Sequence, residues 1–236
     1  MARGFSEPST DDGVHRGITR HAARDDPYRA VMDTTQSFTS HAPARHTQAL
    51  LGPAAVLDQP ALCADGLPRC PWALSSSVIL EDHDTRWGRT PVRSSGWFEA
   101  LALEVFQAGL APGTALGRHG ALREAFREFS PHDAALLDDD DVDELLLDPR
   151  MIRNRAKLVA VIGVARVTQA WDTEDWEELC TPGAGEHLTQ DRDAMARSLA
   201  VRLRGLGVAH VGPGIGQHFL ARTGVLPAHV PGCHHE

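Results

Sequence analysis

Residues 94–110 read SSGWFEALALEVFQAGL, and this stretch decides the fold class of the chain. Its large apolar side chains recur at spacings of three and four residues: Trp97, Phe98, Leu101, Val105 and Phe106. This period is typical of an amphipathic α-helix, which the sequence predicts to end near Gly109. Ser95 is a candidate N-cap, because a serine hydroxyl can accept a hydrogen bond from a backbone N–H of the first turn.

The same helical period continues along the rest of the chain. It predicts further helices over 117–129, 132–137, 140–147, 149–171, 189–204 and 213–223. The alternation of apolar and polar residues that marks a half-buried strand is not convincing anywhere. We therefore expect an all-α fold without an internal repeat.

A glycine-rich connection, GLGVAHVG at 205–212, joins the last two predicted helices. Glycines permit positive φ and leave backbone N–H groups accessible, and the N-terminus of the following helix adds the positive end of its dipole. This pattern is consistent with a helix-hairpin-helix that holds a phosphate. A plain turn between two core helices explains the same spacing.

Two Cys–His pairs lie at opposite ends of the predicted folded region. Cys70 and His83 form the first pair, and His229 and Cys233 form the second. Two thiolates and two imidazoles would close a tetrahedral structural zinc site that joins the two ends. His234 and His235 could substitute as ligands, and a surface cysteine beside a histidine-rich tail is the alternative.

Residues 1–66 are rich in Ser, Thr, Asp, Pro, Gly and His and lack a sustained period. We expect a mostly disordered N-terminal extension, with one short helix near 47–57, and a folded domain over 67–236. No apolar run reaches the roughly 20 residues of a membrane span, and the first residues lack a secretory signal, so we expect a cytoplasmic protein. Four cysteines among 236 residues do not make a disulfide scaffold.

Several motifs together resemble those of bacterial DNA-3-methyladenine glycosylase I. They are RCPW at 69–72, HDTRWG at 83–88, FEAL at 98–101, LEVFQAGL at 103–110, IRNRAK at 152–157, VGP at 211–213 and HVPGC at 229–233. These motifs occur in order and nearly without gaps, which makes the match specific. Residues 1–66 lie outside it.

The resemblance implies an all-α helix-hairpin-helix DNA glycosylase fold with a structural Zn²⁺ at the ends of the domain. The family's four zinc-ligand positions fall on Cys70, His83, His229 and Cys233. Family members flip a damaged nucleotide out of double-stranded DNA and hydrolyse its N-glycosidic bond, which releases an alkylated purine such as 3-methyladenine. The family's base-contacting carboxylate falls on Glu104, which we expect to be the catalytic residue. We also expect a monomer that works at the bacterial nucleoid.

The expected base pocket departs from the family at two positions. Asp82 stands where a base-contacting tyrosine precedes the zinc-ligand histidine, and Pro112, after Leu110, stands where a tryptophan stacks on the base. Losing the aromatic ring removes stacking worth about 1–3 kcal/mol and opens volume. Because Asp82 adds a second carboxylate near Glu104, we expect a roomier, more acidic pocket that favours cationic N-alkylated purines more strongly and has an altered or bulkier alkyl-base preference.

Two further groups complete the expected site. Trp72 and Trp87 match family tryptophans and either line the pocket or belong to the core. The expected DNA contacts are Gln107, Gly109, Arg153, Arg155, Lys157, Arg202, Arg204 and Gly212. Charged clusters of this kind are also common on solvated faces.

The net charge of −9, from 23 basic and 32 acidic residues, at first argues against a nucleic-acid partner. The acids are concentrated, however, with eight in 133–148 and eight in 172–193. The remainder of 67–236 is net basic, so one side of the domain can face DNA. The competing functions are a catalytically impaired lesion-binding protein and an interaction protein that reuses the fold.

Overall fold

The computed structural model describes residues 58–181 and 191–236, and most of the regular structure in these ranges is helical. The α-helices are α1 (Ser77–Thr85), α2 (Ser94–Gln107), α3 (His119–Ala125), α4 (Pro131–Ala134), α5 (Asp139–Leu147), α6 (Arg155–Thr168), α7 (Thr173–Cys180), α8 (Arg192–Gly205) and α9 (Pro213–Arg222). Three short 3-10 helices accompany them: η3 (Pro71–Ser75), η4 (Leu116–Arg118) and η5 (Arg127–Phe129).

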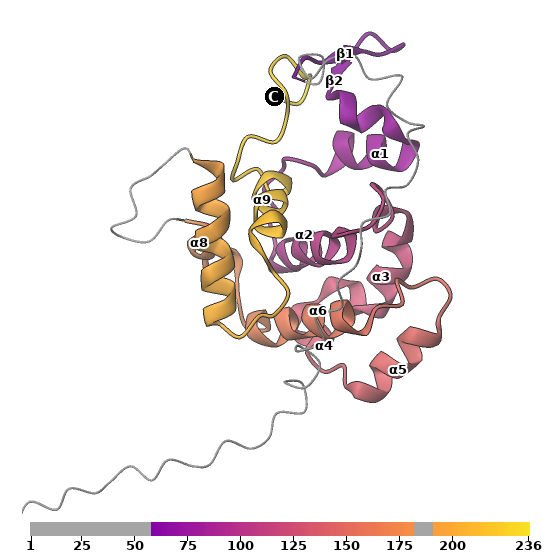
Figure 1. The fold of residues 1–236 in the computed structure, drawn as a ribbon, viewed down its shortest axis with the longest axis vertical. Coiled ribbons are helices and arrows are strands. Elements are labelled where there is room, and N and C mark those ends of the chain that lie inside the picture. Colours follow the sequence, from indigo (N-terminus) through magenta and orange to yellow (C-terminus); the bar gives the residue numbers. More distant parts are fainter. Residues whose placement is uncertain (1–57, 182–190) are drawn as a thin grey trace, which may run out of the picture. The chain divides into compact units, whose positions relative to one another are not determined.

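Helix α2 lies in the middle of the helical domain and carries much of its core (Figure 1). It packs against α4, α6, α7 and α9, so its surface is covered on several sides. Its fully buried side chains include Trp97, Phe98, Leu101 and Phe106. A helix that is apolar nearly all round is typical of such a central position.

The helix predicted to follow Ser95 and end near Gly109 is confirmed as α2, but its N-cap is not Ser95. Arg93 occupies the N-cap position in extended conformation and makes no side-chain capping bond. The adjacent hydroxyl of Ser94 instead accepts a hydrogen bond from Trp176 Nε1 at 2.8 Å. Ser94 therefore joins α2 to α7.

The expectation that no strands occur is wrong for one small element. Strand β1 (Ala61–Leu62) pairs antiparallel with β2 (Pro68–Arg69), with Ala61 opposite Arg69. Two residues per strand are too few for alternation to be visible in the sequence. The pairing joins residues on both sides of the predicted domain boundary at residue 67.

The single helix predicted over 117–129 is divided into η4, α3 and η5, with Glu128 at φ +59°. Two further helices and one helix start also differ from the prediction. Helices α1 and α7 were not expected, and the predicted helix over 149–171 begins only at Arg155. The side chain of Asn154 caps this start by accepting a hydrogen bond from the Lys157 backbone N–H. The short helix expected near 47–57 lies outside the described residues.

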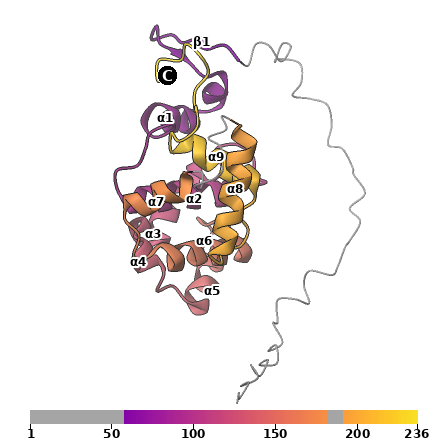
Figure 2. The ribbon, with the colours of Figure 1, turned by 90° about the vertical axis from the view of Figure 1, so that its left-hand side faces the viewer.

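Helices α8 and α9 form an antiparallel hairpin and lie side by side in both views (Figures 1 and 2). Helix α8 ends in a Schellman motif, in which Val208 N–H donates to the Leu203 carbonyl and Gly207 N–H to the Arg204 carbonyl. Gly207 adopts φ +88°, a conformation that favours glycine. Val208 and Leu203 are both buried, which supplies the apolar contact of this motif.

The C-terminal tail after α9 returns to the β1–β2 ribbon and α1 (Figure 2). The backbone N–H of His234 donates to the Pro68 carbonyl at 2.8 Å, which ties the tail to β2. None of the helices in the described ranges has the length and apolarity needed to cross a membrane.

Candidate functional site

Glu104 is the buried carboxylate of helix α2. Its side chain is 5% exposed and its neighbours in the helix are buried apolar residues. A carboxylate in such surroundings needs a charged or hydrogen-bonding partner. The Nε atom of Arg222, the last residue of α9, donates to Glu104 Oε1 at 2.6 Å.

Asp82 on α1 shares the same arginine. Arg222 Nη1 donates to both carboxylate oxygens of Asp82 at 3.0 Å, and Arg86 Nε donates to Asp82 Oδ1 at 2.9 Å. Asp82 and Arg222 are 1% and 8% exposed, so the contacts are largely shielded from water. We call Glu104, Asp82, Arg222 and Arg86 the charged cluster.

The charged cluster is electrically balanced, with two carboxylates and two guanidinium groups. Burial disfavours the charge on Arg222, but Glu104 and Asp82 outweigh that effect and hold the pKa of Arg222 above its usual range. The expectation of a more acidic pocket considered only the two carboxylates. Because Arg222 neutralises them, Asp82 does not add an unpaired negative charge beside Glu104.

Trp87 places an aromatic face against this cluster. The Arg222 guanidinium carbon lies 4.9 Å from the centroid of the Trp87 ring, which is within the range of a cation–π contact. Trp87 Nε1 donates to the Ala228 carbonyl at 2.8 Å, so the ring is anchored to the C-terminal tail. Trp72 contacts both Trp87 and His83 edge-on and is 38% exposed.

Two residues of this arrangement escaped sequence reasoning. Arg222 lies four residues after His218 on α9, and His218 Nδ1 lies 3.7 Å from Glu104 Oε2. The sequence indicates only that Glu104, a lone glutamate on an apolar helix, needs a cationic side chain from another element as its partner. Sequence spacing does not indicate which of the 23 basic residues supplies it.

The end of α2 and the loop after it contain four of the predicted site residues, with Gln107 as the last residue of the helix. The Gln107 amide donates to the carbonyls of Leu110 and Ala111, and its oxygen accepts from the Ala115 N–H. Gln107 thus organises the loop through its own side chain. Gly109, Leu110 and Pro112 are exposed along it.

The four predicted metal ligands converge at the ends of the domain. Cys70 Sγ lies 3.6 Å from His229 Nδ1, Cys233 Sγ lies 3.5 Å from His83 Nε2, and the two imidazole nitrogens lie 3.2 Å apart. A tetrahedral zinc site with ordinary bond lengths has S–N edges of about 3.5 Å and an N–N edge of about 3.3 Å. Cys70, His83, His229 and Cys233 could therefore hold a tetrahedral metal ion.

Asp84, which is not one of the four ligands, orients the His83 ring. His83 Nδ1 lies 2.8 Å from Asp84 Oδ1, which leaves Nε2 directed at the other three donors. Arg69 Nε donates to both oxygens of Asp84, at 3.1 and 2.9 Å. The Arg69 guanidinium holds the pKa of Asp84 well below its usual range, so this carboxylate stays ionised.

The basic residues expected to contact DNA differ in availability. Arg153 and Arg204 are exposed, and Gly212 is the N-cap of α9. Arg155 forms an ion pair with Asp143, and the Lys157 ammonium group donates to the carbonyls of Phe106 and Ala108 instead of standing free for a phosphate. Arg202 Nη1 donates to carbonyls at the end of α7, including that of Leu179 at 2.9 Å, so Arg202 joins α8 to α7.

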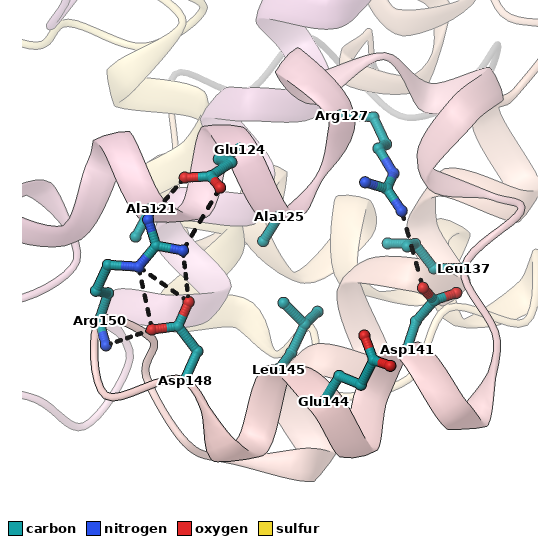
Figure 3. Close-up of a pocket in the computed structure, with 10 residues that line it drawn as sticks. All are labelled: Ala121, Glu124, Ala125, Arg127, Leu137, Asp141, Glu144, Leu145, Asp148 and Arg150. Carbon is teal, nitrogen blue, oxygen red and sulfur yellow. Dashed lines mark hydrogen bonds and ion pairs between the residues drawn. The ribbon is translucent and has the colours of Figure 1, made fainter.

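A cavity of about 150 Å³ lies apart from these residues, between α3 and α5 (Figure 3). At one end Arg150 bridges Asp148 and Glu124, at 2.7 and 2.8 Å. At the other end Arg127 lies 3.8 Å from Asp141. None of the residues that line this cavity belongs to the charged cluster or to the metal ligands, and its acids are largely paired with arginines.

Comparisons with known proteins identify the family of the chain. The sequence profile of the methyladenine glycosylase family matches residues 72–236. The DNA-3-methyladenine glycosylase 1 of Escherichia coli K12 is 28% identical over 179 residues, which is 71% of this chain and 96% of that protein. The DNA-3-methyladenine glycosylase of Haemophilus influenzae is 27% identical over 70% of this chain and 96% of that protein.

Solved structures give the same result. A crystal structure of 3-methyladenine DNA glycosylase I superposes with a TM-score of 0.61 and 27% identity, covering 70% of this chain and 98% of that one. The enzyme from Staphylococcus aureus gives 0.60 and 28%, covering 70% of this chain and 95% of that one. With the family profile covering most of the chain, this protein belongs to the methyladenine glycosylase family and is a DNA glycosylase.

Proposed function

We propose that the protein flips an N-alkylated purine out of double-stranded DNA and hydrolyses its N-glycosidic bond. The observation that carries the proposal is Glu104, a buried carboxylate on the central helix of a glycosylase fold. A buried acceptor of this kind can bind N–H groups of an extruded base, and shielding from water strengthens the contact. Glu104 is the proposed catalytic and base-binding residue.

Several neighbouring residues complete the proposed base pocket. Asp82 and Trp87 contact Arg222 directly, and Trp72 packs against Trp87. Leu110 and Pro112 belong to the exposed loop that follows α2. The proline offers no aromatic face at its position, which supports a preference that differs from that for plain 3-methyladenine.

The proposed DNA-binding surface centres on the α8–α9 hairpin. As a helix-hairpin-helix, its Schellman turn and the N-terminus of α9 after Gly212 would present backbone N–H groups to a phosphate. Arg204 and Arg153 are the exposed cations proposed to contact phosphates, with Gln107 and Gly109 on the loop near the gap left by the base. Arg155 and Arg202 already make contacts within the protein, Arg155 with Asp143 and Arg202 with the end of α7.

The metal proposed for the Cys70, His83, His229 and Cys233 site is a structural Zn²⁺. Two thiolates and two imidazoles suit zinc, and four protein ligands leave no open position for a water molecule. The ion would join η3 and α1 to the C-terminal tail. It would supply stability to the domain and take no part in base release.

The test is base release from methylated DNA. Duplex DNA treated with a methylating agent is incubated with the purified protein, and the released 3-methyladenine and the abasic sites are measured. We expect Glu104→Gln to lower release by about 10- to 100-fold, because a hydrogen bond to a charged group is worth about 1.5–3 kcal/mol. The exposed Glu128→Gln variant is the matched control.

Two outcomes would contradict parts of the proposed function. Salt-dependent binding to alkylated DNA without abasic-site formation would favour the catalytically impaired lesion-binding protein. Neutral effects of Asp82→Tyr and Pro112→Trp on the choice between 3-methyladenine and bulkier alkylated bases would refute the altered preference.

A further inference from the structure

The Arg222 guanidinium occupies the interactions that a cationic base would use. It is a planar, delocalised cation with N–H donors, as is an alkylated purine, and it lies between Glu104 (2.6 Å) and Asp82 (3.0 Å). Its charge also lies over the Trp87 ring at 4.9 Å. Glu104 Oε1, both oxygens of Asp82 and the aromatic face of Trp87 are therefore already in contact with a cation of the chain itself, whereas Glu104 Oε2 accepts no hydrogen bond from Arg222.

The electrostatics of the cluster oppose a second cation. Arg222 and Arg86 balance the two carboxylates, and His218 is a third basic side chain that faces Glu104. A positively charged base placed against Arg222 would meet no unpaired negative charge. Because the Arg222 contacts are shielded from water, repulsion there is screened less than on an open surface.

One edge of the guanidinium remains available as a donor. Arg222 uses Nε for Glu104 and Nη1 for Asp82, while Nη2 makes no hydrogen bond to any described residue. Uncharged purines present acceptors such as N7 and O6 or N3, and an arginine fork is well suited to such an edge. The remaining N–H groups fit an uncharged base better than a cationic one.

We propose that Arg222 is a specificity-determining residue that directs the pocket to uncharged modified purines. The inference rests on the proposed glycosylase function and names the substrate class of the same site. Uncharged alkylated purines with a free acceptor edge, such as 1,N6-ethenoadenine, are the predicted substrates. Cationic purines such as 3-methyladenine are predicted to be poorer substrates.

The chemistry of bond cleavage favours the same assignment. When the C1′–N9 bond breaks, its electron pair moves onto the purine, and water adds to C1′ with loss of a proton. A cationic base leaves as a neutral molecule, whereas an uncharged base gains negative charge until it takes up a proton. Arg222 N–H groups directed at that base stabilise the developing charge in the transition state. The products are the free base and an abasic sugar.

The test compares two substrates with three variants. The substrates are a duplex with one 1,N6-ethenoadenine and methylated duplex DNA that carries 3-methyladenine. Asp82→Asn with Arg222→Met removes one charge of each sign, so the charged cluster stays electrically balanced and only Glu104, which keeps His218 at 3.7 Å, loses its arginine. Arg222→Ala would instead take that arginine from both buried carboxylates. Arg222→Lys keeps the charge without the fork, and the exposed Arg123→Ala is the matched control. Thermal unfolding checks that each variant is folded.

We expect the wild type to release ethenoadenine faster than 3-methyladenine. The double variant should lower ethenoadenine release at least about tenfold and raise 3-methyladenine release several-fold. The release rates of Arg222→Lys should lie between those of the wild type and the double variant. Arg123→Ala should release both bases at the wild-type rates. Release of 3-methyladenine alone by the wild type would overturn the inference and leave the proposed function intact. Equal changes for both substrates in the folded double variant would also overturn it. Release of neither base by the wild type would overturn the proposed function as well.

Discussion

Gly88 lies directly against His229, one of the candidate metal ligands. It adopts φ +75°, and a Cβ atom there would lie 2.6 Å from His229 Nε2. Gly88→Ala should therefore lower stability by about 1–2 kcal/mol through backbone strain and also displace His229. We expect reduced zinc content and a lower unfolding temperature, measured by elemental analysis and thermal unfolding.

Gly109 provides the matched control for this prediction. It has a similar φ of +71°, but a Cβ atom there would meet nothing within 4 Å. Gly109→Ala should show the backbone penalty alone and keep full metal content. If Gly88→Ala retained its zinc and lost no more stability than Gly109→Ala, the steric role of Gly88 would be wrong.

Some residues of the candidate site could be predicted from the sequence, and two, Arg222 and His218, could not. Glu104, Asp82 and the metal ligands belong to motifs with recognisable neighbours, so their numbers follow from the sequence. Arg222 belongs to no motif, and it reaches Glu104 only because α9 packs on α2. The effect of Asp82 on the pocket could not be predicted correctly without that long-range contact.

Among the helices, predictability follows the length of the apolar pattern. The 14-residue helix α2 shows several turns of regular spacing, whereas α7 has eight residues and a mostly acidic surface. Helix α7 forms because Asp172 and Asp175 make a capping box and Trp176 is buried beneath Ser94. A single buried tryptophan in a short acidic segment does not establish a helical period.

Lys157 ties two of the long helices together. It is the only lysine in the sequence, and its ammonium group donates to the carbonyls of Phe106 and Ala108, at 2.7 and 2.6 Å. These carbonyls end α2 and have no partner within the helix. Lys157→Met keeps the apolar stem, and we expect it to lower the free energy of unfolding by about 1.5–3 kcal/mol in urea titrations.

The matched control for Lys157 is Arg153→Met, which removes an exposed charge two residues before the start of α6. It should change the unfolding free energy little, because exposed side chains contribute little to stability. Equal destabilisation by the two variants would show that charge loss near α6, rather than the tie to α2, is responsible.

For the whole molecule, the net charge of −9 does not show that acidic and basic side chains are concentrated in different segments. Many acids lie in α5 and α7, where Asp138 and Asp172 cap the helices and further acids follow in the first turns. Negative side chains at these ends interact favourably with the helix dipoles. The acidity thus stabilises two helices and leaves exposed cations such as Arg204 for the proposed DNA surface.

The proposed zinc ion would close the domain, because its ligands come from segments up to 163 residues apart. A tie across so long a loop restricts the unfolded chain, and by analogy with a long-range cross-link it is worth on the order of 4–5 kcal/mol. Removing the metal with a chelator should therefore lower the unfolding temperature by about 10 °C. Adding Zn²⁺ should restore it.

Thiol labelling tests whether this loss comes from the four ligands. In the zinc-loaded protein we expect only the partly exposed Cys63 to react at pH 8, since Cys70 and Cys233 are buried metal ligands. Burial raises the pKa of Cys180 to about 12, so Cys180 stays protonated and unreactive. After chelation, Cys70 and Cys233 should become reactive while Cys180 remains protected. Reaction of Cys180 together with them would mean that the whole domain unfolds, and unchanged labelling would exclude the two cysteines as metal ligands.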